Sequence, residues 1–216
     1  MALLRIHVGR KTYLFAAVAD GIGGLTSGEV ASAVVIRNLR HVFEQTTKRG
    51  GHIGLERLSR YICRELYRTH VSLAEYGADA GRPMGTTITV AVMCNRRGRI
   101  IHIGDSTCYR MSIYSRRVKK LVKIAHDQFG RLTQSIGYGS YHRPYRKSFF
   151  LNKFSILVLC TDGIYKRMHS RDWFRIYESV GRDISKYSEA LADYVYRKGE
   201  KDNATAICIS GREYKA

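Results

Sequence analysis

The stretch FAAVADGIGGLTSGEVASAVVIRNL, residues 15–39, joins an apolar run, a glycine-rich turn and a helical pattern. The segment YLFAAVA (13–19) predicts a buried strand. The segment GEVASAVVIRNLRHVFEQ (28–45) predicts an amphipathic helix, because its apolar residues recur at intervals of three and four, and Ser27 is placed to cap it. Asp20 lies where the strand meets the glycines. This position suits a metal-binding carboxylate, an acid incidental to a phosphate-binding glycine loop, or an ordinary turn residue.

The pattern beyond this stretch indicates the fold class. A second amphipathic helix is expected at 55–76, and helical periodicity returns at 171–179 and 186–197. Apolar segments predict strands at 86–94, 98–104, 107–114, 117–124 and 204–210, and a pair of strands within 148–160. Helices that are paired in sequence between runs of consecutive strands favour antiparallel sheets with segregated helices over alternating βαβ units. The sequence therefore predicts an α+β fold.

Length and composition restrict the class of protein. A chain of 216 residues suits a single domain over 1–216, and its 44% hydrophobic and 25% charged residues are typical of a soluble globular protein. No apolar run approaches the roughly 20 residues that a membrane span needs. The first residues, MALLRIHVGRK, lack the features of a secretion signal. We therefore expect a cytoplasmic protein without a membrane span, and a monomer.

Charge and cysteine content bear on partners. The chain has 37 Lys and Arg residues against 18 Asp and Glu residues, a net charge of +19, which attracts polyanions such as nucleic acid, anionic lipid or phosphorylated protein. The basic residues are dispersed and no nucleic-acid-binding motif accompanies them, so nucleic acid is a disfavoured partner. The five cysteines are scattered singly without a CxxC pair, and buried reduced thiols are expected.

The glycines after the first strand do not match the known phosphate-binding loops. Gly21 and Gly23 fit the dinucleotide fingerprint GxGxxG, but Thr26 occupies its sixth position and no βα alternation follows. The segment VGRKT (8–12) has neither the spacing nor the Gly-Lys step of GxxxxGK[ST]. These glycines alone therefore give little support to nucleotide binding.

One carboxylate pattern recurs in a chain that is poor in acids. An apolar strand ends in Asp and a small residue in FAAVADG (Asp20), RIIHIGDS (Asp105) and SILVLCTDG (Asp162), and Asp202 begins the last strand in KDNATAICIS. Carboxylates at strand ends are held by rigid backbone and point to one rim of a sheet. They would repel one another unless a cation lay among them. The pattern predicts an oxygen-ligand site for Mg²⁺ or Mn²⁺.

Simpler interpretations exist for each of these residues. A single Asp-Gly after a strand is most often a turn, although three such sites after apolar strands make that explanation weaker. His102 and His126 are nearby imidazoles that could be ligands or acids, but a lone histidine at a strand end is more often an ordinary polar contact.

Six motifs together resemble those of one family. VADGIGGLTSGEVAS, GTTITVAV, IHIGDSTCYR, LTQSIG, LVLCTDGIY and DNATAICI occur in the order and approximate spacing of the motifs of type 2C (PPM) metal-dependent protein serine/threonine phosphatases, especially bacterial ones. The resemblance extends over nearly the whole chain from residue 13. It implies a β-sandwich of two antiparallel sheets flanked by helix pairs, with a binuclear Mn²⁺ or Mg²⁺ centre at one end.

The resemblance also implies roles for individual residues. Asp20 would bridge the two metals, Gly21 would offer its backbone carbonyl to one of them, and Asp162 and Asp202 would complete the other metal's shell. Asp105 is similar to the family's ligand for a third, weaker metal. Asp20, Asp162 and Asp202 are thus the expected catalytic residues. The implied reaction is hydrolysis of phosphoserine and phosphothreonine in proteins by a metal-activated water, with a cognate serine/threonine kinase as a possible partner.

Two segments differ from the family pattern. The family usually has, before the first Asp-Gly strand, an extra strand and an arginine followed by an Asn-Glu-Asp-like run; here twelve residues without an acid precede Tyr13. Arg5 or Arg10 is the available substitute for the phosphate-binding arginine. The family's flap is replaced by FGR (129–131). The alternative function is a catalytically impaired relative that binds phosphoproteins or regulates them.

Overall fold

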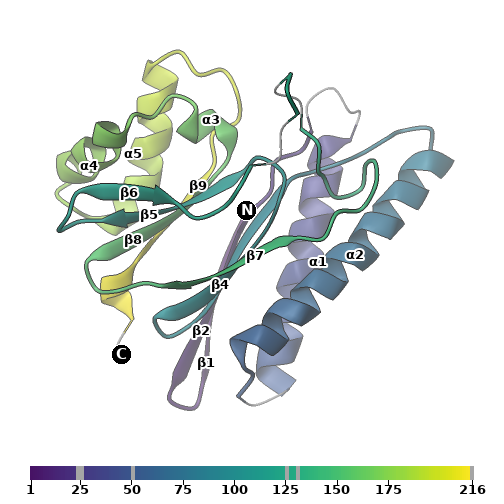
Figure 1. Cartoon of the computed structure of the whole chain (residues 1–216), viewed down its shortest axis with the longest axis horizontal. Coiled ribbons are helices and arrows are strands. Elements are labelled where there is room, and N and C mark those ends of the chain that lie inside the picture. Colours follow the sequence, from purple (N-terminus) through teal and green to yellow (C-terminus); the bar gives the residue numbers. More distant parts are fainter. Residues whose placement is uncertain (23–26, 50–51, 125–126, 130–131, 215–216) are drawn as a thin grey trace.

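Two antiparallel sheets stack face to face, and helices cover their outer faces (Figure 1). A computed structural model describes residues 1–22, 27–49, 52–124, 127–129 and 132–214. This is the α+β sandwich that the sequence predicts. Every strand pairing described is antiparallel, which is incompatible with the parallel sheet of a dinucleotide-binding fold.

The larger sheet has the strand order β1-β2-β3-β4-β7. Its strands are β1 (Ala2–Val8), β2 (Lys11–Val18), β3 (Ile88–Cys94), β4 (Arg97–Ile103) and β7 (Tyr145–Phe150). The strand β2 is an interior, apolar strand, and Tyr13 to Val18 are buried without interruption because both faces of this sheet are covered.

The second sheet has the strand order β6-β5-β8-β9. Its strands are β5 (Thr107–Ser112), β6 (Arg117–Lys120), β8 (Ser155–Cys160) and β9 (Ala206–Ser210). The strand β8 is buried along its whole length, and β6 is a short, charged edge strand. Short charged strands of this kind protect an open sheet edge from pairing with other chains.

Helices flank the two sheets on opposite sides (Figure 1). The long pair α1 (Gly28–Arg49) and α2 (Leu55–Asp79) packs on the larger sheet, and Val35, Leu39 and Ile62 contribute to the core there. The other helices, α3 (Asp162–Tyr165), α4 (Ser170–Ser179) and α5 (Ile184–Arg197), pack on the second sheet. A third apolar cluster fills the space between the sheets.

Most expected elements are present, with three differences. The strand β1 was not expected; its exposed Leu3, Arg5 and His7 alternate with more buried residues, as on a sheet edge. The two strands expected within 148–160 exist as β7 and β8, but they belong to different sheets. The short helix α3 and the 3-10 turn Gly211–Glu213 were also not expected.

Two expectations from composition can be compared with the described residues. All five cysteines lie in this part of the chain and are free thiols as expected; Cys108 and Cys160 are fully buried, but the expected burial is wrong for Cys63, Cys94 and Cys208, which are only partly buried. Among the described residues, no helix combines the length and apolar character needed to cross a membrane.

Candidate metal centre

The Asp20 loop is fixed by the segment that begins β3. The side-chain hydroxyl of Thr86 and the backbone N–H of Thr87 each donate a hydrogen bond to the Asp20 carbonyl oxygen at 2.8 Å. The Asp20 backbone N–H donates in return to Thr87 Oγ1 at 3.2 Å. Both threonines are buried. The GTT motif therefore holds the main chain of Asp20 at the end of β2, and its two threonines have a structural role.

Gly21 brings the start of α1 against this loop. A Cβ atom on Gly21 would lie 2.4 Å from the carbonyl carbon of Gly28, a distance that no side chain tolerates. The two backbones can therefore touch only because residue 21 is glycine. The close approach places Glu29 and Ser32, in the first turns of α1, at the same pocket as Asp20.

Asp105 reaches this pocket from the connection between β4 and β5. The next residue, Ser106, is fully buried, and its hydroxyl lies 2.6 Å from Thr87 Oγ1. One threonine thus contacts both the Asp20 loop and the Asp105 loop. The contact sets the spacing between two carboxylates that are far apart in sequence.

Asp162 and Asp202 come from the second sheet. Asp162 follows β8, where the Thr161 N–H donates to Thr205 O at 3.0 Å and Thr205 N–H donates to Thr161 Oγ1 at 3.0 Å. A Cβ atom on Gly163 would lie 2.7 Å from Asn203 O. These contacts hold the segment before β9 against the end of β8, so the two aspartates share one rim of this sheet.

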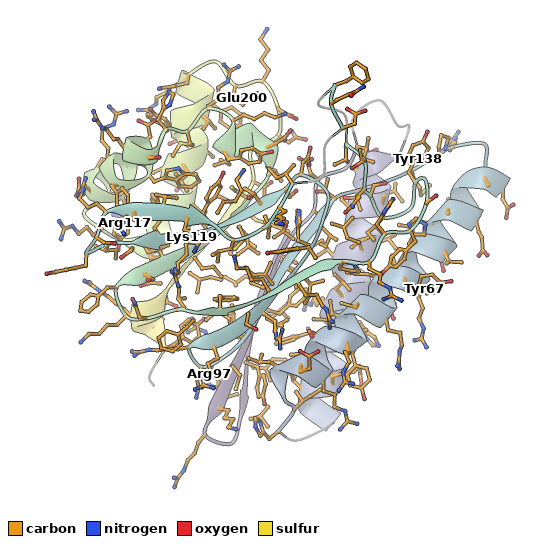
Figure 2. The ribbon with its side chains drawn as sticks, viewed as in Figure 1. Tyr67, Arg97, Arg117, Lys119, Tyr138 and Glu200 are labelled. Carbon is orange, nitrogen blue, oxygen red and sulfur yellow. The ribbon has the colours of Figure 1, made fainter. Side chains whose placement is uncertain are left out.

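The connection from α5 to β9 carries further support for Asp202. Glu200, labelled at the top of Figure 2, accepts a hydrogen bond from the Asp202 N–H at 3.2 Å. Asp202 Oδ1 accepts one from Asn203 N–H at 2.8 Å. The exposed Asp202 is therefore oriented by its own backbone neighbours.

The four aspartates line one pocket of about 470 Å³, which also includes Gly21 and Glu29. All charged residues among its described lining residues are acidic. In a chain with a net charge of +19, such a concentration of carboxylates has to be explained by function or by local structure. Oxygen donors of this kind are the ligands that Mg²⁺ and Mn²⁺ prefer.

Electrostatics distinguish Asp20 from a surface turn residue. Burial, followed by repulsion from Asp162, Asp202 and Asp105, raises the pKa of Asp20 to about 7. Burial and neighbouring negative charges disfavour the ionised form of this carboxyl group, and a bound cation would stabilise that form.

Asp162 provides a second test of whether a cation fits. Its Oδ1 is buried and has no hydrogen-bond partner among the described residues, which is an uncommon state for a buried carboxylate oxygen. Its Oδ2 accepts a hydrogen bond from Lys166 Nζ at 2.5 Å. The hydrogen bond to Asp162, followed by attraction to Asp162, Asp105 and Asp202, raises the pKa of Lys166. The unpartnered oxygen suits a metal ligand.

The carboxylates are not yet gathered into a finished centre. Within the described ranges, no three His, Cys, Asp or Glu side chains lie close enough to form a ready-made metal site. Mutual repulsion is a sufficient cause, because charged carboxylates separate when no cation joins them.

Other residues considered from the sequence lie away from the pocket or outside the description. His102 is buried in β4, its Nδ1 lies 2.9 Å from Thr89 Oγ1, and burial lowers its pKa to about 4. Arg5 donates to Glu213 at 2.5 Å. Arg10 precedes β2 and Asp20 follows it, so the eight residues of this strand, at about 3.3 Å each, separate the two. His126, Gly23, Thr26 and residues 130–131 of the FGR segment fall outside the described residues.

Sequence reasoning did not single out Glu29 or Lys166. Glu29 stands at the start of α1, where an acid is an ordinary helix feature. Lys166 lies four residues after Asp162, a spacing that brings two side chains together on one helical face. That spacing was a usable signal only once a helix was known to begin at Asp162.

Comparison with known proteins identifies the family. A family model described as protein phosphatase 2C matches residues 2–196. The chain belongs to this family. The match confirms the resemblance seen in the motifs, and it ends before Asp202, so the placement of that residue rests on the structure.

Curated relatives of the family extend over most of the chain. Protein phosphatase PhpP of Streptococcus pneumoniae is 26% identical and covers 97% of this chain and 91% of its own length. The serine/threonine phosphatase stp of Listeria monocytogenes is 24% identical over 89% of this chain and 82% of its own.

Solved structures agree with the fold. The serine/threonine phosphatase Stp1 from Staphylococcus aureus superposes with a TM-score of 0.82 at 22% identity, over 97% of this chain and 87% of that one. The serine/threonine phosphatase of S. agalactiae gives a TM-score of 0.81 at 19% identity, over 97% and 92%. At these identities the likeness concerns the fold.

Proposed function

We propose that this chain is a metal-dependent protein serine/threonine phosphatase that hydrolyses phosphoserine and phosphothreonine with two Mn²⁺ or Mg²⁺ ions. The single observation that carries the proposal is the convergence of Asp20, Asp105, Asp162 and Asp202 on one acid-lined pocket. The family supports the same activity, because its curated relatives are a protein phosphatase and serine/threonine phosphatases. Residues 1–216 are proposed to form one phosphatase-like domain.

The proposed roles follow the motifs. Asp20 would contact both metals, the carbonyl of Gly21 would complete one shell, and Asp162 and Asp202 would complete the other. Asp105 would hold a third, weaker ion. When bound, the metals supply activation of a water and stabilisation of the negative charge that builds during phosphoryl transfer.

The chain's own residues prepare the pocket for that chemistry. The hydrogen bonds that the Thr86 hydroxyl and the Thr87 N–H donate to the Asp20 carbonyl oxygen fix the main chain of Asp20 at the pocket. Without cations, the acidic lining repels a phosphate monoester dianion. Cations held by these carboxylates would offset that repulsion.

The outer surface has the opposite sign of charge. Arg117 and Lys119 extend from the edge strand β6 into solvent (Figure 2). The net charge of +19 draws phosphorylated and acidic polypeptides toward the molecule, and the metals then provide attraction within the pocket. Phosphorylated proteins are the proposed substrates, and a serine/threonine kinase that produces them is the proposed partner.

The second candidate function is phosphoprotein binding by a family member that hydrolyses its ligand inefficiently. The observation that favours it is that no Arg or Lys lines the pocket among the described residues, and that Arg5 is engaged with Glu213. Such a protein would bind metal and phosphopeptide but release little phosphate.

One assay tests the proposal. Phosphate release from a phosphothreonine peptide is measured with Mn²⁺, with Mg²⁺ and with EDTA. We expect release with either metal and none in EDTA. Full activity in EDTA contradicts the metal centre, whereas metal and peptide binding without phosphate release favours the second function.

A further inference from the structure

Lys166 forms an ion pair with Asp162, one of the aspartates that line the acidic pocket. Its Nζ lies 2.5 Å from Asp162 Oδ2, an ion pair between positions i and i+4 that begins at the first residue of α3. Asp162 Oδ1 remains buried and has no hydrogen-bond partner in the part of the chain that the structure describes. One oxygen of this carboxylate is thus neutralised by the chain itself, and the other is available to a ligand.

The exposure of the two side chains shows which of them can move. The Asp162 side chain is 11% exposed, and that of Lys166 is 55% exposed. The carboxylate is held by the end of β8 and by the Gly163 contact with Asn203. The lysine side chain is long and flexible, so its ammonium group can leave Asp162 and enter water at little cost.

Lys166 is attracted by more than one carboxylate. Asp105 and Asp202 stand near enough to contribute to the field at its ammonium group, in addition to Asp162. The lysine therefore interacts with the same group of acids that a divalent cation would join. Two cations that compete for one group of carboxylates weaken each other's binding.

We propose that Lys166 is a built-in counter-ion of the acidic pocket, which stabilises the metal-free protein through Asp162 and which a divalent cation displaces when it binds. The inference rests on the proposed function, because it assigns a regulator to the same metal centre. Its consequence is a protein that folds without metal and binds metal less tightly than its carboxylates alone would.

The competition gives effects of opposite sign in the two states. Lys166→Met keeps a long apolar side chain but removes the charge, so the carboxylates of the metal-free protein lose a partner. The melting temperature in EDTA is expected to fall by about 2–4 °C. The Mn²⁺ dissociation constant, measured by calorimetric titration, is expected to fall about fivefold, because no ammonium has to be displaced.

Two further variants serve as controls. Lys166→Arg keeps the positive charge, and its Mn²⁺ affinity is expected to stay within about twofold of wild type. Arg40→Met removes the cation of a comparable i,i+4 pair with Glu44 on α1, away from the pocket, and is expected to leave Mn²⁺ affinity unchanged. Salt at about 0.5 M is expected to reduce the difference between wild type and Lys166→Met.

The outcomes separate this inference from the proposed function. Two outcomes would show that the pair is an ordinary surface ion pair and that the inference is wrong. In the first, Lys166→Met binds Mn²⁺ with the affinity of wild type. In the second, the substitution lowers the melting temperature by the same amount with and without Mn²⁺. If wild type itself binds no Mn²⁺, the proposed function is wrong, and the inference falls with it.

Discussion

Thr87 and Asp20 exchange two hydrogen bonds. The Asp20 backbone N–H donates to Thr87 Oγ1 at 3.2 Å, and the Thr87 backbone N–H donates to the Asp20 carbonyl oxygen at 2.8 Å. The same hydroxyl lies 2.6 Å from Ser106 Oγ, next to Asp105. A buried threonine therefore joins the two loops that carry the acids of the larger sheet. Its side chain holds the site without being a ligand.

Thr87→Val is expected to lower the free energy of unfolding by about 1–3 kcal/mol, because it leaves the Asp20 N–H and the Ser106 hydroxyl without this partner. Mn²⁺ affinity should fall in the same variant. Thr47→Val is the matched control: the Thr47 hydroxyl donates to Phe43 O in α1, and its loss leaves no buried donor unpaired. Urea unfolding in EDTA compares the two; equal losses would show that Thr87 has no special role.

Asp20→Asn and Asp162→Asn are expected to abolish Mn²⁺ binding and phosphate release, since each removes a charge and nearly preserves shape. The metal-free fold of Asp20→Asn should be more stable by about 1 kcal/mol, because repulsion with Asp162 and Asp202 is relieved. Calorimetric titration and thermal melts in EDTA measure both effects. A turn residue behaves differently, because Asn tolerates the backbone conformations of Asp. Wild-type binding and turnover in both variants would return these aspartates to that role.

The stability of the metal-free protein should depend on pH through Asp20. The pKa of Asp20 is raised from 3.8 to about 7 in the folded state, so the folded protein holds this proton more tightly than the unfolded chain. The resulting stabilisation is complete below about pH 4 and is lost as pH rises through about 7. Over this range the free energy of unfolding should fall by roughly 1–2 kcal/mol, after allowance for solvent screening. Thermal melts in EDTA at pH 5 to 9 measure it. Asp20→Asn should lack this part of the pH dependence, and an identical profile in both proteins would contradict the assignment.

Gly163→Ala is expected to reduce stability by about 1–3 kcal/mol, because the new methyl group would lie 2.7 Å from Asn203 O. It should also weaken Mn²⁺ binding, since the contact sets the distance between the Asp162 and Asp202 segments. Gly54→Ser is the control: nothing lies within 4 Å of a Cβ there, and serine is a favourable residue before α2. A Gly163→Ala protein with wild-type metal affinity would show that the two segments are not coupled.

Salt should act on substrate encounter. If the basic surface steers phosphorylated partners, raising salt from about 0.05 to 0.5 M is expected to increase KM for a phosphoprotein several-fold and to change kcat little. Steady-state kinetics at both salt concentrations test this. A larger effect on kcat would place the salt-sensitive step after binding, and tight site-specific binding of nucleic acid at physiological salt would support a different partner.

The sequence predicted those parts of the molecule that follow from local pattern. The buried strand β8 and the helices α1 and α2 are long, apolar or periodic, and each was expected near its observed position. The strand β1 alternates weakly and includes an exposed leucine, so its pattern was not recognised, although the Gly9 turn leading to β2 was a usable signal.

Other parts depend on tertiary contacts that a single sequence does not contain. Nothing in residues 145–160 indicates that β7 and β8 pair with strands of different sheets. The aspartates were predicted as a group from their strand-end positions, and they do line one pocket. The contact of Gly163 with Asn203 joins residues forty positions apart, and the ion pair of Lys166 required knowledge of α3.

The four aspartates that line the pocket come from residue 20 at one extreme and residue 202 at the other, 182 positions apart. During synthesis at about 5–20 residues per second, Asp202 follows Asp20 by roughly 10–40 s. Throughout that interval the nascent chain has no complete pocket, because the last strand that brings Asp202 to the rim has not been made. A fragment released before Asp202 is made would carry three of the four aspartates, so the proposed metal-dependent activity would depend on synthesis of the chain through β9.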